Sequence, residues 1–243
     1  MKRLLVLLLL AATVVSASAQ RDVTKFLGIP VDGTKAEMIQ KLRRKGFAYD
    51  AATDILSGEF NGDNAYVYIV TNHDKVWRIM VKFADTRSET GIRISFNRLC
   101  QQMMDSEKYS AVSPNSAYII PSTEEIGYEL RVHDKRYEAA FTQVPETVDS
   151  AAIWNDVYKK LREKYSDEDI KDALASADEP YDPLSPPDSV DKRRSEIYMD
   201  YILRTMEEKR KNSVWFMISE SYGMYSIVMY YDNEYNHASG EDL

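Results

Sequence analysis

Residues 55–84 most constrain the fold, because apolar and polar side chains alternate there along three short stretches. The alternation is plainest in the third stretch, where every second residue is large and apolar: Trp77, Ile79, Val81 and Phe83. A period of two residues is typical of a strand with one face in a core and the other largely in water. Polar segments at 61–64 and 72–75 separate the stretches, and Asn61-Gly62 favours a tight hairpin turn. We therefore predict antiparallel strands over residues 55–60, 65–71 and 76–84.

A helix is predicted on each side of this meander. Thr34 and Glu37 have capping-box spacing, an apolar stripe follows, and Gly46 suits the exit from a first helix. Thr86 and Glu89 show the same spacing ahead of a second helix, which should end at about Tyr109. The apolar residues of this second helix fall on one face: Ile92, Phe96, Leu99 and Met103.

The rest of the chain is predicted to continue in the same manner. We expect strands over 117–120, 126–133 and 137–144, then a helix striped by Ile153, Val157 and Leu161. Residues 167–175 either extend this helix or form a separate short one. A charged helix over 191–211 and a hairpin of strands 214–219 and 224–231 complete the prediction.

The order of these motifs indicates an internal repeat. The tripeptide His-Asp-Lys at 73–75 returns at 133–135, an offset of 60 residues, and a looser echo of 77–83 lies at 225–231. We therefore predict an α+β fold built of tandem units, each a helix packed on an antiparallel β-meander.

The predicted division of the chain follows from these patterns. It comprises a signal peptide at 1–19, a first unit with its following helix at 20–112, a second meander and helix at 113–175, an acidic Pro-rich linker at 176–190, and a helix with a C-terminal hairpin at 191–243. Residues 20–243 are also long enough to form one compact domain, and both interpretations stay open.

The N-terminus predicts export. Lys2 and Arg3 precede an apolar run at 4–15, and the small residues at 17–19 suit cleavage before Gln20. The run is well short of the roughly 20 residues that span a bilayer, so no stable membrane span is expected after cleavage. Cleavage would leave 29 basic and 39 acidic residues, a net charge of −10, which argues against a nucleic-acid partner. We expect a periplasmic or secreted protein.

Tyrosines are the candidate binding residues. Tyr66 and Tyr68 fall on one face of their predicted strand, and Tyr222, Tyr230 and Tyr235 gather around the last hairpin. Exposed rings of this kind stack on a glycan or anchor a protein partner. The alternative is that they complete a half-buried sheet.

Histidines supply the only other candidate chemistry. His73 and His133 occupy predicted turns, and an enzyme would need both of them to meet carboxylates in one cleft. No zinc, Gly-rich phosphate or EF-hand motif is present, so no metal or cofactor is predicted. Cys100 lies at helical spacing among apolar residues, which predicts a buried structural thiol.

The leader ending Ser18-Ala19-Gln20, the entry at 26–34 (FLGIPVDGT) and the closing residues 230–233 (YYDN) together resemble uncharacterised exported proteins of Bacteroidetes. That resemblance implies export and no particular activity. More loosely, a helix and a meander repeated in tandem is similar to the beta-lactamase-inhibitor-protein and BamE-like architecture, which implies shape alone.

The function expected from the sequence is a non-catalytic binding or scaffolding module of the cell envelope, contacting an envelope protein or a glycan. The alternative is a periplasmic hydrolase or another enzyme with a site assembled between the repeats.

Overall fold

A computed structural model describes residues 23–114, 117–144, 150–175 and 189–237. The predicted signal peptide and most of the predicted Pro-rich linker lie outside these residues. The chain has a mixed α+β fold organised around one eight-stranded sheet in which every pairing is antiparallel. The spatial order of the strands is β3-β4-β5-β6-β10-β9-β8-β7, so β6 and β10, far apart in the sequence, are neighbours at the centre.

The bounds of the strands place each half of the sheet in a different part of the chain. One half comprises β3 (Ala48–Asp50), β4 (Ile55–Phe60), β5 (Asp63–Asn72) and β6 (Lys75–Phe83). The other comprises β7 (Tyr109–Ala111), β8 (Glu138–Gln143), β9 (Ser213–Ser221) and β10 (Met224–Asp232). A separate two-stranded ribbon consists of β1 (Lys25–Phe26) and β2 (Ile29–Pro30).

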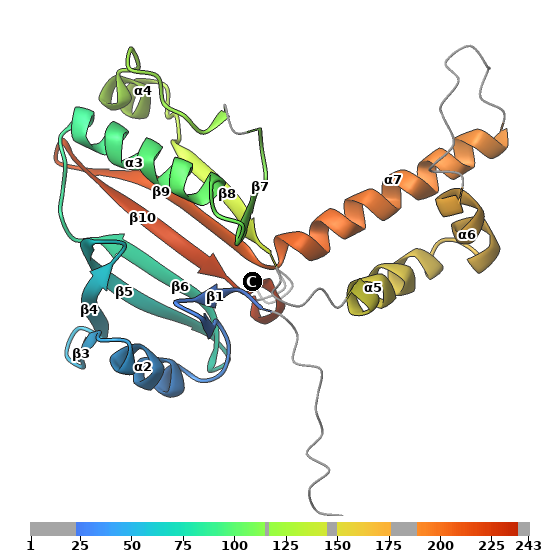
Figure 1. Cartoon of the computed structure of the whole chain (residues 1–243), viewed down its shortest axis with the longest axis horizontal. Coiled ribbons are helices and arrows are strands. Elements are labelled where there is room, and N and C mark those ends of the chain that lie inside the picture. Colours follow the sequence, from blue (N-terminus) through green and yellow to red (C-terminus); the bar gives the residue numbers. More distant parts are fainter. Residues whose placement is uncertain (1–22, 115–116, 145–149, 176–188, 238–243) are drawn as a thin grey trace, which may run out of the picture.

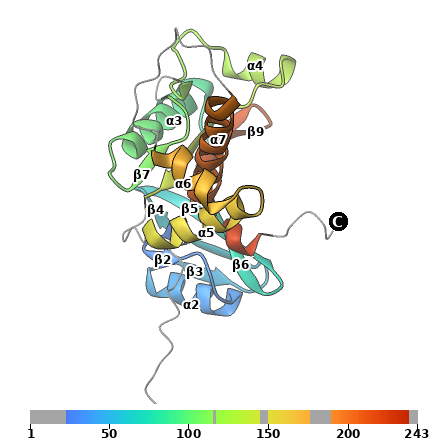
Figure 2. The same ribbon diagram turned by 90° about the vertical axis from the view of Figure 1, so that its right-hand side faces the viewer.

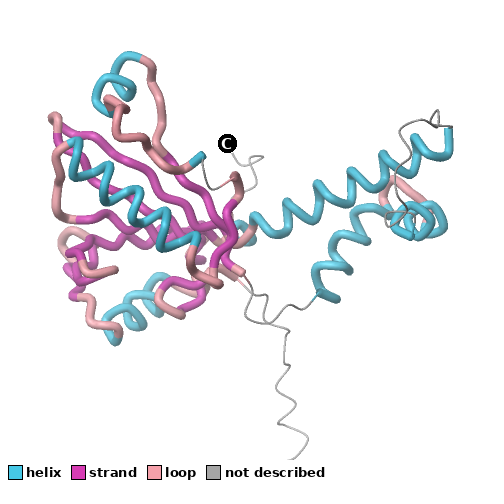
Figure 3. Tube along the Cα trace, turned by 45° about the horizontal axis from the view of Figure 1, so that its top comes forward, coloured by secondary structure: helices cyan, strands magenta, loops and turns pink. Residues whose placement is uncertain are grey.

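The helices form two groups. The group at the sheet is α2 (Lys35–Arg44), α3 (Glu89–Met104) and α4 (Ile126–Val132), with the 3₁₀ turn η3 (Glu234–Asn236) near the C-terminus. The second group is α5 (Ser150–Arg162), α6 (Asp167–Ala175) and α7 (Ser189–Arg210). Figure 1 shows α3 lying along β9 and β10 while α5, α6 and α7 project away from the sheet. The same separation of strands from the projecting helices is visible in Figure 3.

The main core lies between α2, α3 and one face of the sheet. Met38 and Leu42 from α2, and Ile92 and Phe96 from α3, are at most 1% exposed and belong to a single apolar cluster. The sheet supplies the alternate residues of its strands to this cluster: Ala65, Val67, Ile69, Ile79, Val81, Phe83, Ala139, Phe141, Val214, Phe216, Ile218, Tyr225, Ile227, Met229 and Tyr231. Burial of one face only is the cause of the two-residue period in the sequence.

Local signals account for the first half of the fold. Thr34 caps α2 with a complete capping box, in which the Glu37 carboxylate accepts a hydrogen bond from the Thr34 amide. Asn61 and Gly62 have φ angles of 54° and 82°, the left-handed pair that a two-residue hairpin turn requires. The strands predicted at 55–60, 65–71 and 76–84 are confirmed as β4, β5 and β6.

The helices α5, α6 and α7 form an arm with its own core. Six buried residues make up this second apolar cluster: Val157, Leu161, Tyr165, Ile170, Ala173 and Ile197. The arm is inserted between β8 and β9, and its two ends meet where the Gln143 amide donates to the Asn212 carbonyl at 2.8 Å. Figure 2, turned by 90°, shows the three helices in front of the sheet. Of the two interpretations left open for 167–175, the separate helix is confirmed.

Residues 126–133, predicted as a strand, form α4 instead. Glu125, at the N-cap of α4, makes no side-chain cap. The carboxylate of Glu89 on α3 takes that role, accepting from the amides of Ile126 at 2.7 Å and Gly127 at 3.3 Å. Because the cap comes from another helix, the local alternation of residues could not reveal it.

Three smaller predictions were also wrong. Residues 117–120 form no strand. The second helix ends at Met104, and Tyr109 begins β7. Its N-cap is Ser88, which accepts a hydrogen bond from the Gly91 amide, whereas Thr86 was predicted.

The predicted correspondence at an offset of 60 residues pairs unlike structures. His73 lies in the β5–β6 turn with a φ of 46°, but His133 is the C-cap of α4 with a φ of −105°. The looser echo at 225–231 falls on β10, which pairs with β6 at the centre of the sheet.

Candidate functional site: the open face of the sheet

The face of the sheet opposite α2 and α3, here called the open face, carries a row of large side chains. Pairing of Tyr68 with Met80, Met80 with Tyr230, Tyr230 with Trp215 and Trp215 with Ala140 aligns five residues across β5, β6, β10, β9 and β8. All five are partly exposed, whereas their neighbours along the strands point into the core. A second row runs beside it through Tyr66, Lys82, Val228, Met217 and Glu138.

A cationic and aromatic cluster includes two residues of the first row, Tyr230 and Trp215. The Arg78 guanidinium is 4.3 Å from the ring centre of Trp77, 4.9 Å from that of Tyr230 and 5.6 Å from that of Trp215. Trp215 and Tyr230 stack with ring centres 4.0 Å apart and planes 17° from parallel. Contacts of this geometry hold a guanidinium over aromatic faces.

Asp232 fixes the orientation of this cluster. Its carboxylate accepts hydrogen bonds from Arg78 Nε at 2.6 Å, from Arg78 Nη2 at 2.7 Å and from Trp215 Nε1 at 2.9 Å. The Asp232 side chain is 2% exposed and that of Arg78 is 24% exposed. A bidentate pair with a buried carboxylate leaves Arg78 little rotational freedom, so the surface around it is rigid.

The electrostatics next to the cluster favour neutral groups. Burial raises the pKa of the Tyr230 hydroxyl, and nearby Arg78 opposes part of that rise. Burial also raises the pKa of Glu234, with the Asp232 charge adding to the effect.

A hollow of about 470 Å³ adjoins Trp215, bounded by Glu207, Lys211 and Glu234.

The predicted tyrosines divide into two groups. Tyr66, Tyr68 and Tyr230 lie on the open face, with Tyr66 42% exposed. Tyr235 lies in η3, where its ring is 4.7 Å from Lys211 Nζ. Tyr222 lies in the turn between β9 and β10, fully exposed and outside both rows.

Two main members of the cluster escaped prediction, Trp215 and Arg78. Trp77 was assigned to the core face with Ile79, but the register shifts at Val70 and Thr71, so that Val70 pairs with Arg78 and Thr71 with Val76. Trp77 is the extra residue of this bulge and contacts the Arg78 and His237 side chains instead.

The two histidines lie in separate places. His133 contacts Glu129 Oε2 at 2.8 Å and the Tyr128 ring at the end of α4, at the top of Figure 1. His73 lies in the turn of the β5–β6 hairpin, in the lower half of the sheet. The two histidines belong to different elements of the fold, and neither borders the hollow beside Trp215.

Two further kinds of site, a metal centre and a reactive thiol, were considered for the described part of the chain. Among those residues, no group of three His, Cys, Asp or Glu side chains is placed to hold a metal ion. Cys100 is fully buried in the main core, as predicted, and burial raises the pKa of its thiol to about 12. A thiol that stays protonated at neutral pH is a poor nucleophile.

The fold and this face define an α+β protein with an exposed, aromatic antiparallel sheet. Comparison with protein-family models, with curated proteins and with solved structures finds no match to the chain. Within the residues described, no helix is both long enough and apolar enough to cross a bilayer.

Proposed function

We propose that this chain is an exported, non-catalytic binding module whose open face contacts a protein of the cell envelope. The observation that carries the proposal is the row of Tyr68, Met80, Tyr230 and Trp215, which crosses the centre of the sheet and remains partly exposed. Tyr, Trp, Met and Arg are the residue types enriched at the centres of protein interfaces.

The geometry of the cluster favours a protein over a glycan. A sugar ring stacks on an unoccupied aromatic face, but Trp215 and Tyr230 stack on each other and Arg78 lies over both. What remains available is a broad, rigid surface of ring edges, methionine side chains and a half-buried cation. Surfaces of that kind bind by shape complementarity over a large area.

The experiment that tests the proposal compares two tyrosine variants. Affinity purification of the tagged protein from its native envelope should recover a partner with the wild type and with Tyr222→Ala, because Tyr222 lies outside the rows. The double variant Tyr66→Ala/Tyr68→Ala should recover at least tenfold less of that partner, since interface tyrosines of this kind contribute about 1–2 kcal/mol each. Equal recovery by all three proteins, or turnover of a substrate in an activity screen, would overturn the proposal.

We also propose tandem units as the finer architecture, with bounds that differ from those expected from the sequence. One unit is α2 with β3, β4, β5 and β6, and the other is α3 with β7, β8, β9 and β10. The support is the mirrored strand order about the β6–β10 pair, together with the echo of 77–83 at 225–231. Fragments 23–85 and 86–243 should therefore associate when they are produced together, which co-purification would measure, and a failure to associate would count against two units.

A further inference from the structure

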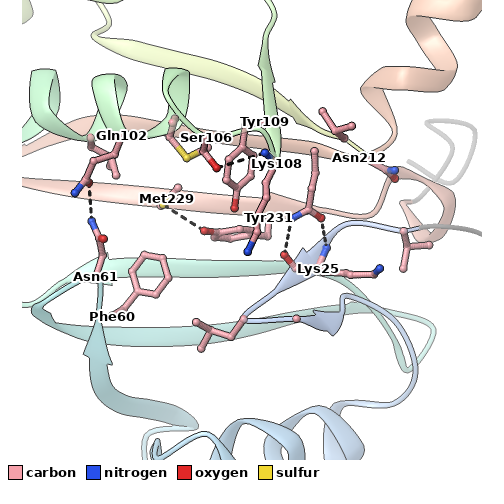
Figure 4. Close-up of a pocket in the computed structure, with 17 residues that line it drawn as sticks. Lys25, Phe60, Asn61, Gln102, Ser106, Lys108, Tyr109, Asn212, Met229 and Tyr231 are labelled. Carbon is pink, nitrogen blue, oxygen red and sulfur yellow. Dashed lines mark hydrogen bonds between the residues drawn. The ribbon is translucent and has the colours of Figure 1, made fainter. Parts of the chain in front are cut away.

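A cavity of about 380 Å³ lies on the core side of the molecule, away from the open face. It is enclosed by the β1–β2 ribbon, the C-terminal end of α3, the start of β7 and the end of β10 (Figure 4). Its volume falls within the range of small-molecule sites in proteins. None of the residues that suggested function in the sequence borders it.

The inner wall of this cavity is apolar. Leu99 and Met103 from α3, Met229 and Tyr231 from β10 and Phe60 from β4 are the large side chains there. Four of them are at most 6% exposed, so the wall is shielded from bulk solvent and rigidly packed. A wall of this kind favours the hydrocarbon portion of a ligand, because binding removes apolar surface from water.

Hydrogen-bond donors surround the apolar wall. The hydroxyls of Tyr109 and Tyr231 lie close enough to influence each other's pKa, and Gln143 also influences that of Tyr109. Burial raises the pKa of both hydroxyls, so both keep their protons at neutral pH. The Tyr231 hydroxyl donates a hydrogen bond to Met229 Sδ at 3.8 Å, and a thioether is a weak acceptor.

The charged residues that line the cavity are all basic. Lys25 and Lys108 both border it, and among the described residues of the lining none is Asp or Glu, in a chain that has 39 acidic residues against 31 basic ones. Over the described ranges, no carboxylate is found in an ion pair with Lys108, whose side chain extends from the start of β7 toward Tyr231 in Figure 4. The Lys108 ammonium at the edge of an apolar wall favours an anionic group.

We propose that this cavity binds a small amphipathic anion, a monocarboxylate with an unbranched apolar chain. The chain lies against Met103, Met229 and Phe60, and the carboxylate faces Lys108 with the tyrosine hydroxyls beside it. The cavity shares no residue with the two rows of the open face, so a negative result for ligand binding would leave the proposed protein-binding function unaffected.

The test uses isothermal titration calorimetry of the whole protein with decanoate as the probe. We expect saturable binding of one decanoate per chain and about tenfold weaker binding by Lys108→Gln, which corresponds to about 1.4 kcal/mol, because the charge that faces the carboxylate is lost. Lys82→Gln removes the same charge from an exposed residue of the open face and should bind decanoate as the wild type does. Tyr66→Ala/Tyr68→Ala should also bind normally.

Two comparisons make the result decisive. Decylammonium has the same chain with the opposite charge and should not bind, and Ser106→Phe, which places a ring at the cavity wall, should abolish decanoate binding while the far-ultraviolet circular dichroism stays native. No binding of decanoate, equal binding of decylammonium, or equal weakening by Lys108→Gln and Lys82→Gln would each overturn the assignment.

Discussion

Asp232 is the residue on which the open face depends most. Three hydrogen bonds from Arg78 and Trp215 converge on one nearly buried carboxylate, so that a cation and an indole share a single acceptor. A buried ion pair contributes little when both partners are replaced together, but loss of one partner leaves the other charge without compensation. The main effect of the network is therefore to fix the orientation of the Arg78 and Trp215 side chains, and its net contribution to the stability of the fold is smaller.

Replacing Asp232 with alanine should lower the free energy of unfolding by about 3 kcal/mol, because Arg78 would remain half-buried without its carboxylate. Urea denaturation measures this value. Asp85→Ala provides the control, since Asp85 is exposed. An equal loss of unfolding free energy in the two variants would show that the Asp232 network does not stabilise the fold more than an exposed aspartate does.

Glu208 is the most buried carboxylate that contributes to the pH response of the arm. Its side chain is 2% exposed and accepts hydrogen bonds from Lys160 on α5 at 2.9 Å and from Lys211 at 2.6 Å. Burial alone would raise the pKa of this carboxyl, but the two lysines outweigh burial and hold the pKa below its ordinary value of 4.5.

A lowered folded-state pKa means that the stabilisation is present above the ordinary value and is lost as the pH falls through the lower one. The unfolded chain takes up the proton first, so the arm should weaken as the solution is acidified below about pH 4.5. Glu208→Gln should show a smaller drop in unfolding free energy between about pH 7 and about pH 3.5 than the wild type. Urea titrations at the two values measure it, with Glu207→Gln, 61% exposed, as the control that should behave as the wild type.

At the scale of elements, α4 shows how a helix can be specified from outside its own sequence. Its first amides are capped by Glu89 of α3, and a Cβ added at Gly127 would lie 2.5 Å from the Tyr225 hydroxyl. The glycine therefore permits the close approach, and the carboxylate satisfies amides that would otherwise have no partner.

Glu89→Ala should therefore release α4 while leaving the rest of the fold in place. We expect a loss of about 1–2 kcal/mol, typical of a removed helix cap, and faster amide exchange confined to residues 126–132. Hydrogen exchange with mass spectrometry resolves that segment. Glu107→Ala changes an exposed glutamate beyond the other end of α3, and exchange rates that match in the two variants would contradict the capping role.

At the scale of the whole molecule, the arm is an insertion into a hairpin. β8 and β9 are paired from Thr142–Ser213 to Glu138–Met217. The hydrogen bond between Gln143 and Asn212 closes this ladder at the point where the arm is joined to the two strands. The two apolar clusters share no residue, so each part has its own source of hydrophobic stabilisation.

Replacing residues 144–211 with an Asn-Gly turn should therefore leave a folded sheet. The flanking pair of Gln143 and Asn212 already has the geometry of a closed hairpin end, and Asn-Gly suits a two-residue connection. We expect a cooperative urea transition and retained near-ultraviolet circular dichroism from Trp77 and Trp215. A shortened chain without a cooperative transition would show that the sheet needs the arm to fold.

Prediction from sequence succeeded where the determinants are local. The meander of β4, β5 and β6, the capping box at Thr34 and the hairpin of β9 and β10 follow from side-chain period and turn chemistry within a few residues. Tyr66 and Tyr68 were placed on one face of their strand for the same reason, since alternation assigns faces directly. Trp77 was misplaced because one bulge reverses that assignment.

The sequence by itself therefore determined the strand faces, the turns and the apolar stripes of the main helices, because each of these is a property of neighbouring residues. Tertiary structure alone decided that β6 pairs with β10, that Glu89 makes a helix of residues 126–132 and that Arg78 meets Trp215 over Asp232. It likewise decided the cavity beside Lys108. Each of these depends on contacts between residues far apart in the chain, and the hydrophobic effect that drives such contacts has no direction of its own. Which surfaces meet is settled only when the whole sheet closes around one core.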